Sequence, residues 1–102
     1  MGEYFYVANL DKKEYLHNHR FGGGLKLGEI ALSGGCAAGA LILLLAQGER
    51  RMGRWRGDRI VVVGDYDESG LYKECQETYR DISKEVVEEL RAENWEDFTY
   101  SP

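Results

Sequence analysis

The sequence predicts a single α+β domain over residues 1–102. In it, a mixed or antiparallel sheet of about four or five strands packs against a buried central helix and an amphipathic C-terminal helix. Three observations indicate this fold class. A chain of 102 residues has the size that forms one hydrophobic core. Runs of aromatic and β-branched residues predict strands near the start and in the middle of the chain. Apolar residues at helical spacing predict a helix near its end.

The first two strands are predicted to form a hairpin. Glu3–Leu10 is rich in aromatic and β-branched residues, as strands are. Asp11–Lys13 is a polar turn, after which Glu14–His17 can pair back as the second arm. The glycines of Gly22–Gly24 then predict a loop that needs a positive φ or a close approach of the backbone.

An uncharged run from Ile30 to Ala46 is predicted to form the centre of the domain. Apolar residues alternate over Leu25–Leu32 with a slip at Gly28, which predicts a strand with a bulge or two short strands. A helix is expected from about residue 36 to residue 47. Because it is apolar on all sides, we expect it to be buried over most of its surface. The run is shorter than the roughly 20 apolar residues that a membrane span needs, so we expect a soluble cytoplasmic protein.

The second half of the chain predicts one buried strand and one amphipathic helix. Arg59–Gly64 is a continuous apolar run, which is typical of a strand in the middle of a sheet. The segment Leu71–Arg80 fits a short helix or a strand equally well. Apolar residues then recur at helical spacing from about residue 82 to residue 93, with Asp81 placed to cap the helix. Trp95 and Phe98 are expected to anchor the tail.

The net charge of −5 is distributed unevenly along the chain. Residues 1–64 carry nine Lys/Arg against six Asp/Glu, a balance of +3, whereas residues 65–102 carry four against twelve, a balance of −8. Five of the eight arginines lie between Arg50 and Arg59. This asymmetry argues against an extended nucleic-acid-binding surface. It leaves open a local phosphate site, or a homo-oligomer that associates through surfaces of opposite charge.

The turn Ser33-Gly34-Gly35 is the first candidate ligand-binding site. It leads into the predicted central helix, and the free backbone N–H groups and dipole of a helix start suit a phosphate or a carboxylate. The turn is not a Walker A loop, because no Gly-Lys-Ser/Thr follows it. The alternative is that the small residues only let the helix pack closely on the sheet.

His17, His19 and Arg20 form the second candidate site. On a strand the two histidines would share one face, as a metal pair requires, and imidazoles beside a glycine loop can also donate to an anion. Both could equally be ordinary surface or core histidines. Asp65 and Asp67 follow the predicted buried strand, where α/β proteins often build sites, although a polar turn would look the same. A metal-dependent hydrolase would use these two histidines and two aspartates.

Arg54, Trp55 and Arg56 form the third candidate site. Guanidinium groups beside an aromatic ring are suited to phosphate contact and base stacking. The same arginines could instead pair with the acidic C-terminal helix, within one chain or between subunits. The sequence leaves both interpretations open.

Two segments resemble a family of small, uncharacterised prokaryotic and phage-associated proteins. From Asn9 to Leu27 the pattern is N-L-D-K-K-E-Y-L-H-x-H-x-F-G-x-G-L-K-L, and from Trp55 to Tyr66 it is W-x-G-D-R-I-V-V-x-G-D-Y. The resemblance implies no activity. The chain departs from the family at Gly23, where an acidic residue is frequent, and after the central helix, where the family is longer.

The function predicted from the sequence is a small non-enzymatic binding module. Its ligand would be a phosphate-bearing, nucleotide-like small molecule or, for a phage-encoded protein that counters host defence, a host protein. We expect no cofactor and can name no catalytic residue, because the sequence offers no nucleophile–base pair. The alternatives are the metal-dependent hydrolase described above and a homo-oligomeric structural protein.

Overall fold

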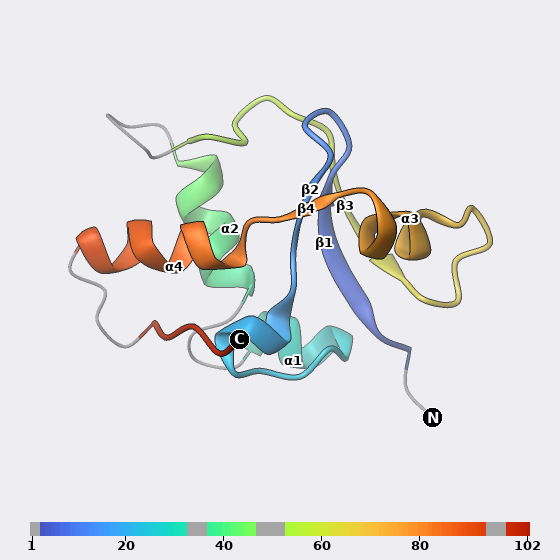
Figure 1. Cartoon of the computed structure of the whole chain (residues 1–102), viewed down its shortest axis with the longest axis horizontal. Helices are drawn as coiled ribbons and strands as arrows, with labels where there is room; N and C mark the ends of the chain where they lie inside the picture. Colours follow the sequence, from blue (N-terminus) through green and yellow to red (C-terminus); the bar gives the residue numbers. More distant parts are fainter. Residues whose placement is uncertain (1–2, 33–36, 47–52, 94–97) are drawn as a thin grey trace.

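The computed structural model describes residues 3–32, 37–46, 53–93 and 98–102. Its centre is a mixed four-stranded sheet in the order β3-β1-β2-β4 (Figure 1). The strands are β1 (Phe5–Asn9), β2 (Glu14–Leu16), β3 (Ile60–Gly64) and β4 (Arg80–Asp81). β1 pairs antiparallel with both β2 and β3, whereas β4 pairs parallel with β2. The sheet and its helices form the α+β domain that the sequence predicts.

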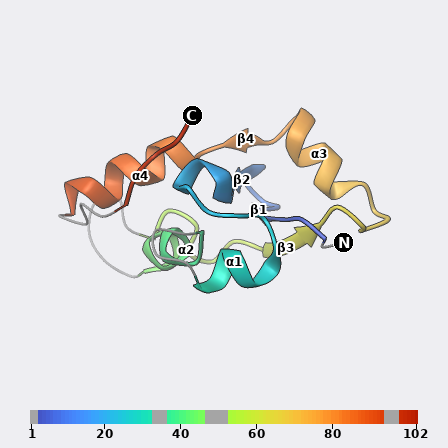
Figure 2. The same ribbon diagram turned by 90° about the horizontal axis from the view of Figure 1, so that it is seen from below.

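Helices cover both faces of this sheet. They are the 3₁₀ helix η1 (Asn18–Phe21) and the α-helices α1 (Leu27–Leu32), α2 (Ala37–Leu45), α3 (Leu71–Glu77) and α4 (Ser83–Ala92). Figure 2 shows α2 and α4 on one side of the sheet and α3 on the other. Because strand residues alternate between the two faces, each face has its own core.

The larger core lies between the sheet and helices α2 and α4. Val7 and Leu16 contribute from the strands, and Val86 and Leu90 from the apolar stripe of α4 that the sequence predicts. Phe98 is fully buried in this core and packs edge-on against the Phe21 ring, at 5.1 Å between centroids. The predicted anchor role of Phe98 is thus confirmed, whereas Trp95 lies outside the described residues.

The smaller core lies under α3 and is largely aromatic. Tyr6 is buried here, and its ring stacks on that of Tyr72 at a centroid distance of 4.2 Å. The ring of Tyr15 is 4.9 Å from that of Tyr6, and burial raises the Tyr15 pKa to about 12. Cys75 of α3 is buried in the same core, where burial raises the pKa of its thiol to about 11.

The predicted hairpin is confirmed, and Asn9 stabilises its turn. The β1–β2 register pairs Asn9 with Glu14. The Asn9 side-chain oxygen accepts the backbone N–H groups of Asp11 and Lys12 at 2.9 and 2.8 Å, a local bond for which Asn is well suited. The turn leaves Lys13 with a φ of 56°. Glu14–Leu16 is therefore held in register with β1.

The strand predicted over Leu25–Leu32 is wrong, because residues 27–32 form α1. The slip at Gly28 leaves Leu27 and Ile30 three residues apart, which is helical spacing. Ile30 is buried, Leu27 is 55 % exposed, and the Glu29 carboxylate accepts the backbone N–H of Lys26 at 3.0 Å. This local cap favours a helical turn over an extended chain.

One further expectation is corrected by the arrangement of the elements. β3 lies at an edge of the sheet and not in its middle, with Val62 48 % exposed. α2 is buried over most of its surface, as predicted, although Ile42 is 67 % and Leu45 40 % exposed. Leu71–Arg80, which fitted either a helix or a strand, forms α3 and the first residue of β4.

Candidate functional site

The guanidinium group of Arg54 is held by carboxylates. It donates to Glu14 Oε2 and Glu85 Oε2, each at 2.9 Å, and lies 3.9 Å from Glu89 Oε1. Of the two interpretations of this arginine, the structure thus shows pairing with the acidic C-terminal helix. Arg80 donates to the same Glu14 oxygen at 2.9 Å. The charge of Arg54 is therefore largely compensated inside the protein.

Trp55 belongs to the larger core and not to the surface. Its side chain is fully buried, and its indole N–H donates to Glu14 Oε1 at 2.8 Å. The ring has no face open to solvent on which a base could stack. Arg56, by contrast, is exposed and donates to the backbone carbonyl of Ala46 at 3.5 Å.

His17 and His19 lie together, but not on one strand. β2 ends at Leu16, so the chain enters η1 before His19, and the two imidazole centroids are 5.5 Å apart. Burial lowers the pKa of His17 below its ordinary 6.5. Arg20 lies 3.5 Å from Asp81, measured from Nε to Oδ2. The positive charge nearest the histidines is thus also paired with a carboxylate.

Ser33, Gly34 and Gly35 lie outside the described residues. The first described residue of α2 is Ala37, and its backbone N–H donates to the Asn18 side-chain oxygen at 2.7 Å. Asn18 is 1 % exposed, and its amide nitrogen donates to the carbonyl of Gly24 at 2.6 Å. Asn18 therefore joins η1, the glycine loop and the start of α2. Its side-chain oxygen accepts the Ala37 N–H, which an anion bound at the start of α2 would need.

The aspartates predicted after β3 belong to turns. Asp65 Oδ1 accepts the backbone N–H of Tyr4 at 3.0 Å, and Asp67 Oδ2 accepts that of Ser69 at 3.0 Å. Within the part of the chain that the structure describes, no three His, Cys, Asp or Glu side chains form a group that could hold a metal ion. Of the predicted site residues, the structure brings together His17, His19 and Arg20, and separately Arg54 and Trp55.

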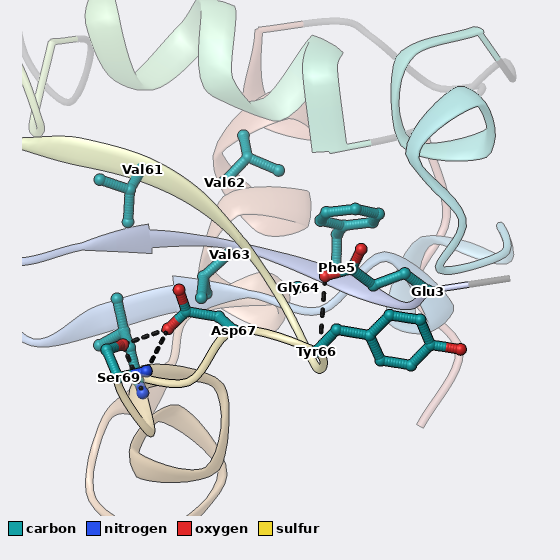
Figure 3. Close-up of a pocket in the computed structure, with 10 residues that line it drawn as sticks. Glu3, Phe5, Val61, Val62, Val63, Gly64, Tyr66, Asp67 and Ser69 are labelled. Carbon is teal, nitrogen blue, oxygen red and sulfur yellow. Dashed lines mark hydrogen bonds between the residues drawn. The ribbon is translucent and has the colours of Figure 1, made fainter.

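A surface that the sequence analysis missed runs along the outer edge of β3. It is a groove of about 560 Å³, called here the edge groove, and Figure 3 shows its lining. The lining residues are Glu3, Phe5, Val61, Val62, Val63, Gly64, Tyr66, Asp67, Ser69 and Leu71. Consecutive residues of β3 point to opposite faces of the sheet, yet all of Val61–Gly64 line the groove. It therefore follows the edge of the strand and not one face.

The hydrogen-bond pattern shows which backbone groups of β3 point outward. Two backbone hydrogen bonds lie just beyond the ends of β3, each 2.9 Å long. The N–H of Leu10 donates to the carbonyl of Arg59, and the N–H of Asp65 donates to the carbonyl of Tyr4. Pairing between antiparallel strands alternates along the chain, so residues 59, 61, 63 and 65 direct their backbone groups to β1. Ile60, Val62 and Gly64 therefore direct theirs away from the sheet. No strand of the described residues pairs with this outer side.

The ends of the edge groove differ from its middle. Val62 is half exposed in the middle, and Tyr66 at the C-terminal end is 62 % exposed. The carboxylate of Glu3 lies directly over Gly64, where a Cβ would fall 1.9 Å from Glu3 Oε2. A side chain at residue 64 would therefore have to displace the Glu3 carboxylate. Glu3 and Asp67 make the C-terminal end acidic, while the middle is apolar.

No protein-family model, curated protein or solved structure matches this chain. In the described part of the chain, no helix has the length and apolar character to cross a membrane.

Proposed function

We propose that this chain is a non-catalytic protein-interaction module that binds an extended segment of polypeptide along the outer edge of β3. The observation that supports it is the edge groove, in which the outward backbone groups of Ile60, Val62 and Gly64 follow an apolar surface. An exposed strand edge is a ready template for one more strand. Main-chain hydrogen bonds supply affinity in such binding, and alternate side chains supply specificity.

The charged groups of the site favour this function over capture of a phosphate. Arg54 is bound by Glu14 and Glu85, and Arg20 is paired with Asp81. An anionic ligand would have to compete with these carboxylates for the two guanidinium groups. The edge groove instead has acidic groups at one end, so it favours a peptide with a basic residue there. The phosphate-bearing ligand stays a prediction.

The groove also defines the chemistry of the bound segment. β-Branched or apolar residues would pack beside Val62 in the middle of the groove. A Lys or Arg near Glu3 and Asp67 would find carboxylates at the C-terminal end. Such a segment resembles an ordinary amphipathic strand, and it needs no ligand-specific pocket.

The decisive test is Val62→Pro, with Val62→Thr as its matched control. Proline removes the N–H of residue 62, which points outward, and leaves the hydrogen bonds to β1 in place. Threonine keeps both that N–H and the β-branched shape. The proteins are screened against a displayed library of short peptides, and the affinities of enriched peptides are measured by fluorescence polarisation.

We expect enrichment of extended apolar segments that carry a basic residue. Val62→Pro should weaken their binding about tenfold, because it removes one donor and leaves a carbonyl of the bound peptide without its partner. Val62→Thr should change it by less than about threefold. Equal binding by Val62→Pro and the unmodified protein, or no enrichment by a chain that is monomeric under the conditions of the screen, would refute the proposed function.

A further inference from the structure

We infer that the strand that occupies the edge groove is β3 of a second copy of this chain, paired antiparallel about a two-fold axis at Val62. This inference rests on the proposed function, since it names the partner for the same edge. The result would be a continuous sheet across two subunits. A two-fold interface of this kind uses the same patch on both subunits.

The backbone of β3 is complementary to itself in this register. Val62 lies opposite Val62 of the partner subunit, and Ile60 lies opposite Gly64 of the partner subunit. Each of these residues directs its N–H and C=O outward, so each pair can exchange both hydrogen bonds. The Gly64 carbonyl already accepts from Asp67 N–H at 3.1 Å, and a carbonyl oxygen has a second lone pair for the partner's donor.

The charges at the two ends of β3 select the antiparallel orientation. Arg59 precedes the strand and Asp65 follows it. In the register about Val62, Arg59 lies directly opposite Asp65 of the partner subunit, and by symmetry this pair occurs twice. The Arg59 side chain is 73 % exposed and contacts Asp11 at 2.8 Å, which leaves other guanidinium donors for a second carboxylate. A parallel arrangement would place like charges together.

The apolar character of this edge also indicates that it is covered. Soluble proteins usually protect a free edge strand with a lysine, a proline or a bulge. The strand Ile60–Gly64 has none of these, and its pairing with β1 is uninterrupted. The exposed apolar residues Leu27 and Ile42 belong to α1 and α2, which lie on the same side of the molecule as β3 (Figure 2). A second copy at this edge would reduce the exposure of that side.

The test exchanges the charges at the two ends of the strand. Arg59→Glu alone places Glu opposite Asp65, and Asp65→Arg alone places Arg opposite Arg59, so each variant repels its own copy. Mixed together, the two variants restore both opposite-charge pairs in one heterodimer. Sedimentation equilibrium over a wide concentration range measures the three association constants. Thermal unfolding of each variant checks that it is folded.

We expect the unmodified chain to dimerise. Each single variant should raise the dimer dissociation constant about tenfold, and the mixture should return to within about threefold of the original value. Val62→Pro should abolish the dimer, while Val62→Thr retains it. A chain that stays monomeric at millimolar concentration, or a dimer that does not respond to these changes, overturns the inference.

The two proposals can fail separately. A monomeric chain that still binds library peptides in a manner sensitive to Val62→Pro would reject the second copy and keep the strand-binding function. A chain that neither dimerises nor binds peptides at this edge would reject both. A dimer unaffected by Val62→Pro would locate self-association elsewhere on the surface.

Discussion

Replacement of Glu14 by alanine is predicted to destabilise the fold strongly, because one carboxylate holds three donors. The Glu14 side chain is 8 % exposed. It accepts the indole N–H of Trp55 at 2.8 Å and guanidinium N–H groups of Arg54 and Arg80 at 2.9 Å each. Its removal leaves a fully buried indole N–H without its acceptor.

The magnitude follows from the burial of each partner. An unsatisfied buried N–H costs about 1–3 kcal/mol. The Arg54 side chain is 25 % exposed and keeps Glu85, so its lost contact adds about 1 kcal/mol. The half-exposed Arg80 adds little. A total of about 2–4 kcal/mol corresponds to a fall in Tm of roughly 10–20 °C for a domain of this size.

The assay is thermal unfolding followed by circular dichroism, with two comparison variants. Glu14→Gln keeps an acceptor for Trp55 and removes the charge, so its Tm should lie between those of Glu14→Ala and the unmodified protein. Glu68→Ala removes an exposed glutamate and should change stability by less than about 0.5 kcal/mol. A Tm for Glu14→Ala equal to that of Glu68→Ala would refute the reasoning.

Three further predictions concern single side chains. Asn18→Ala should lower the unfolding free energy by about 1–2 kcal/mol, measured by urea denaturation, because the Ala37 N–H loses its acceptor. Asn18→Asp keeps that acceptor but places a buried carboxylate against the Gly24 carbonyl, so it should lose at least as much. Burial lowers the pKa of His17, so the unfolded chain binds a proton more readily, and stability should fall as the pH drops below 6.5; denaturation of His17→Asn should show a smaller dependence on pH. A Cys36→Ser variant leaves Cys75 as the one cysteine of the sequence. Burial raises the pKa of the Cys75 thiol to about 11, so this thiol should react with a thiol reagent at pH 8 only as the protein unfolds. Rapid reaction of the folded protein would contradict the burial of Cys75.

Local patterns predicted the elements that depend on local spacing. The alternating run at the start of the chain and the apolar run at Ile60–Gly64 form strands, and the helical spacing of Val86 and Leu90 forms α4. α1 was missed because Leu27 and Ile30 fit both a slipped strand and a helical turn. The parallel pairing of Arg80–Asp81 spans too few residues to leave a pattern.

The candidate site was less accessible to sequence reasoning, because its features depend on contacts between distant segments. Arg54 and Trp55 look like a ligand site until Glu14, forty residues earlier in the chain, is placed beside them. Whether an apolar strand is central or at an edge depends on strand order, which no residue of Ile60–Gly64 encodes. One local signal of the inferred pairing between two copies of β3 was present in the sequence, since the opposite charges of Arg59 and Asp65 lie on either side of Ile60–Gly64.

The most direct test of the strand-addition account is hydrogen exchange at single backbone amides of β3, measured by NMR on the intact chain. The N–H of Val63 points to β1 and should be protected at every protein concentration. The N–H of Val62 points outward and should exchange quickly in dilute protein. Its exchange should slow as the dimer forms or when a strand-binding peptide is added. Exchange at Val62 that is unchanged under both conditions would contradict the account.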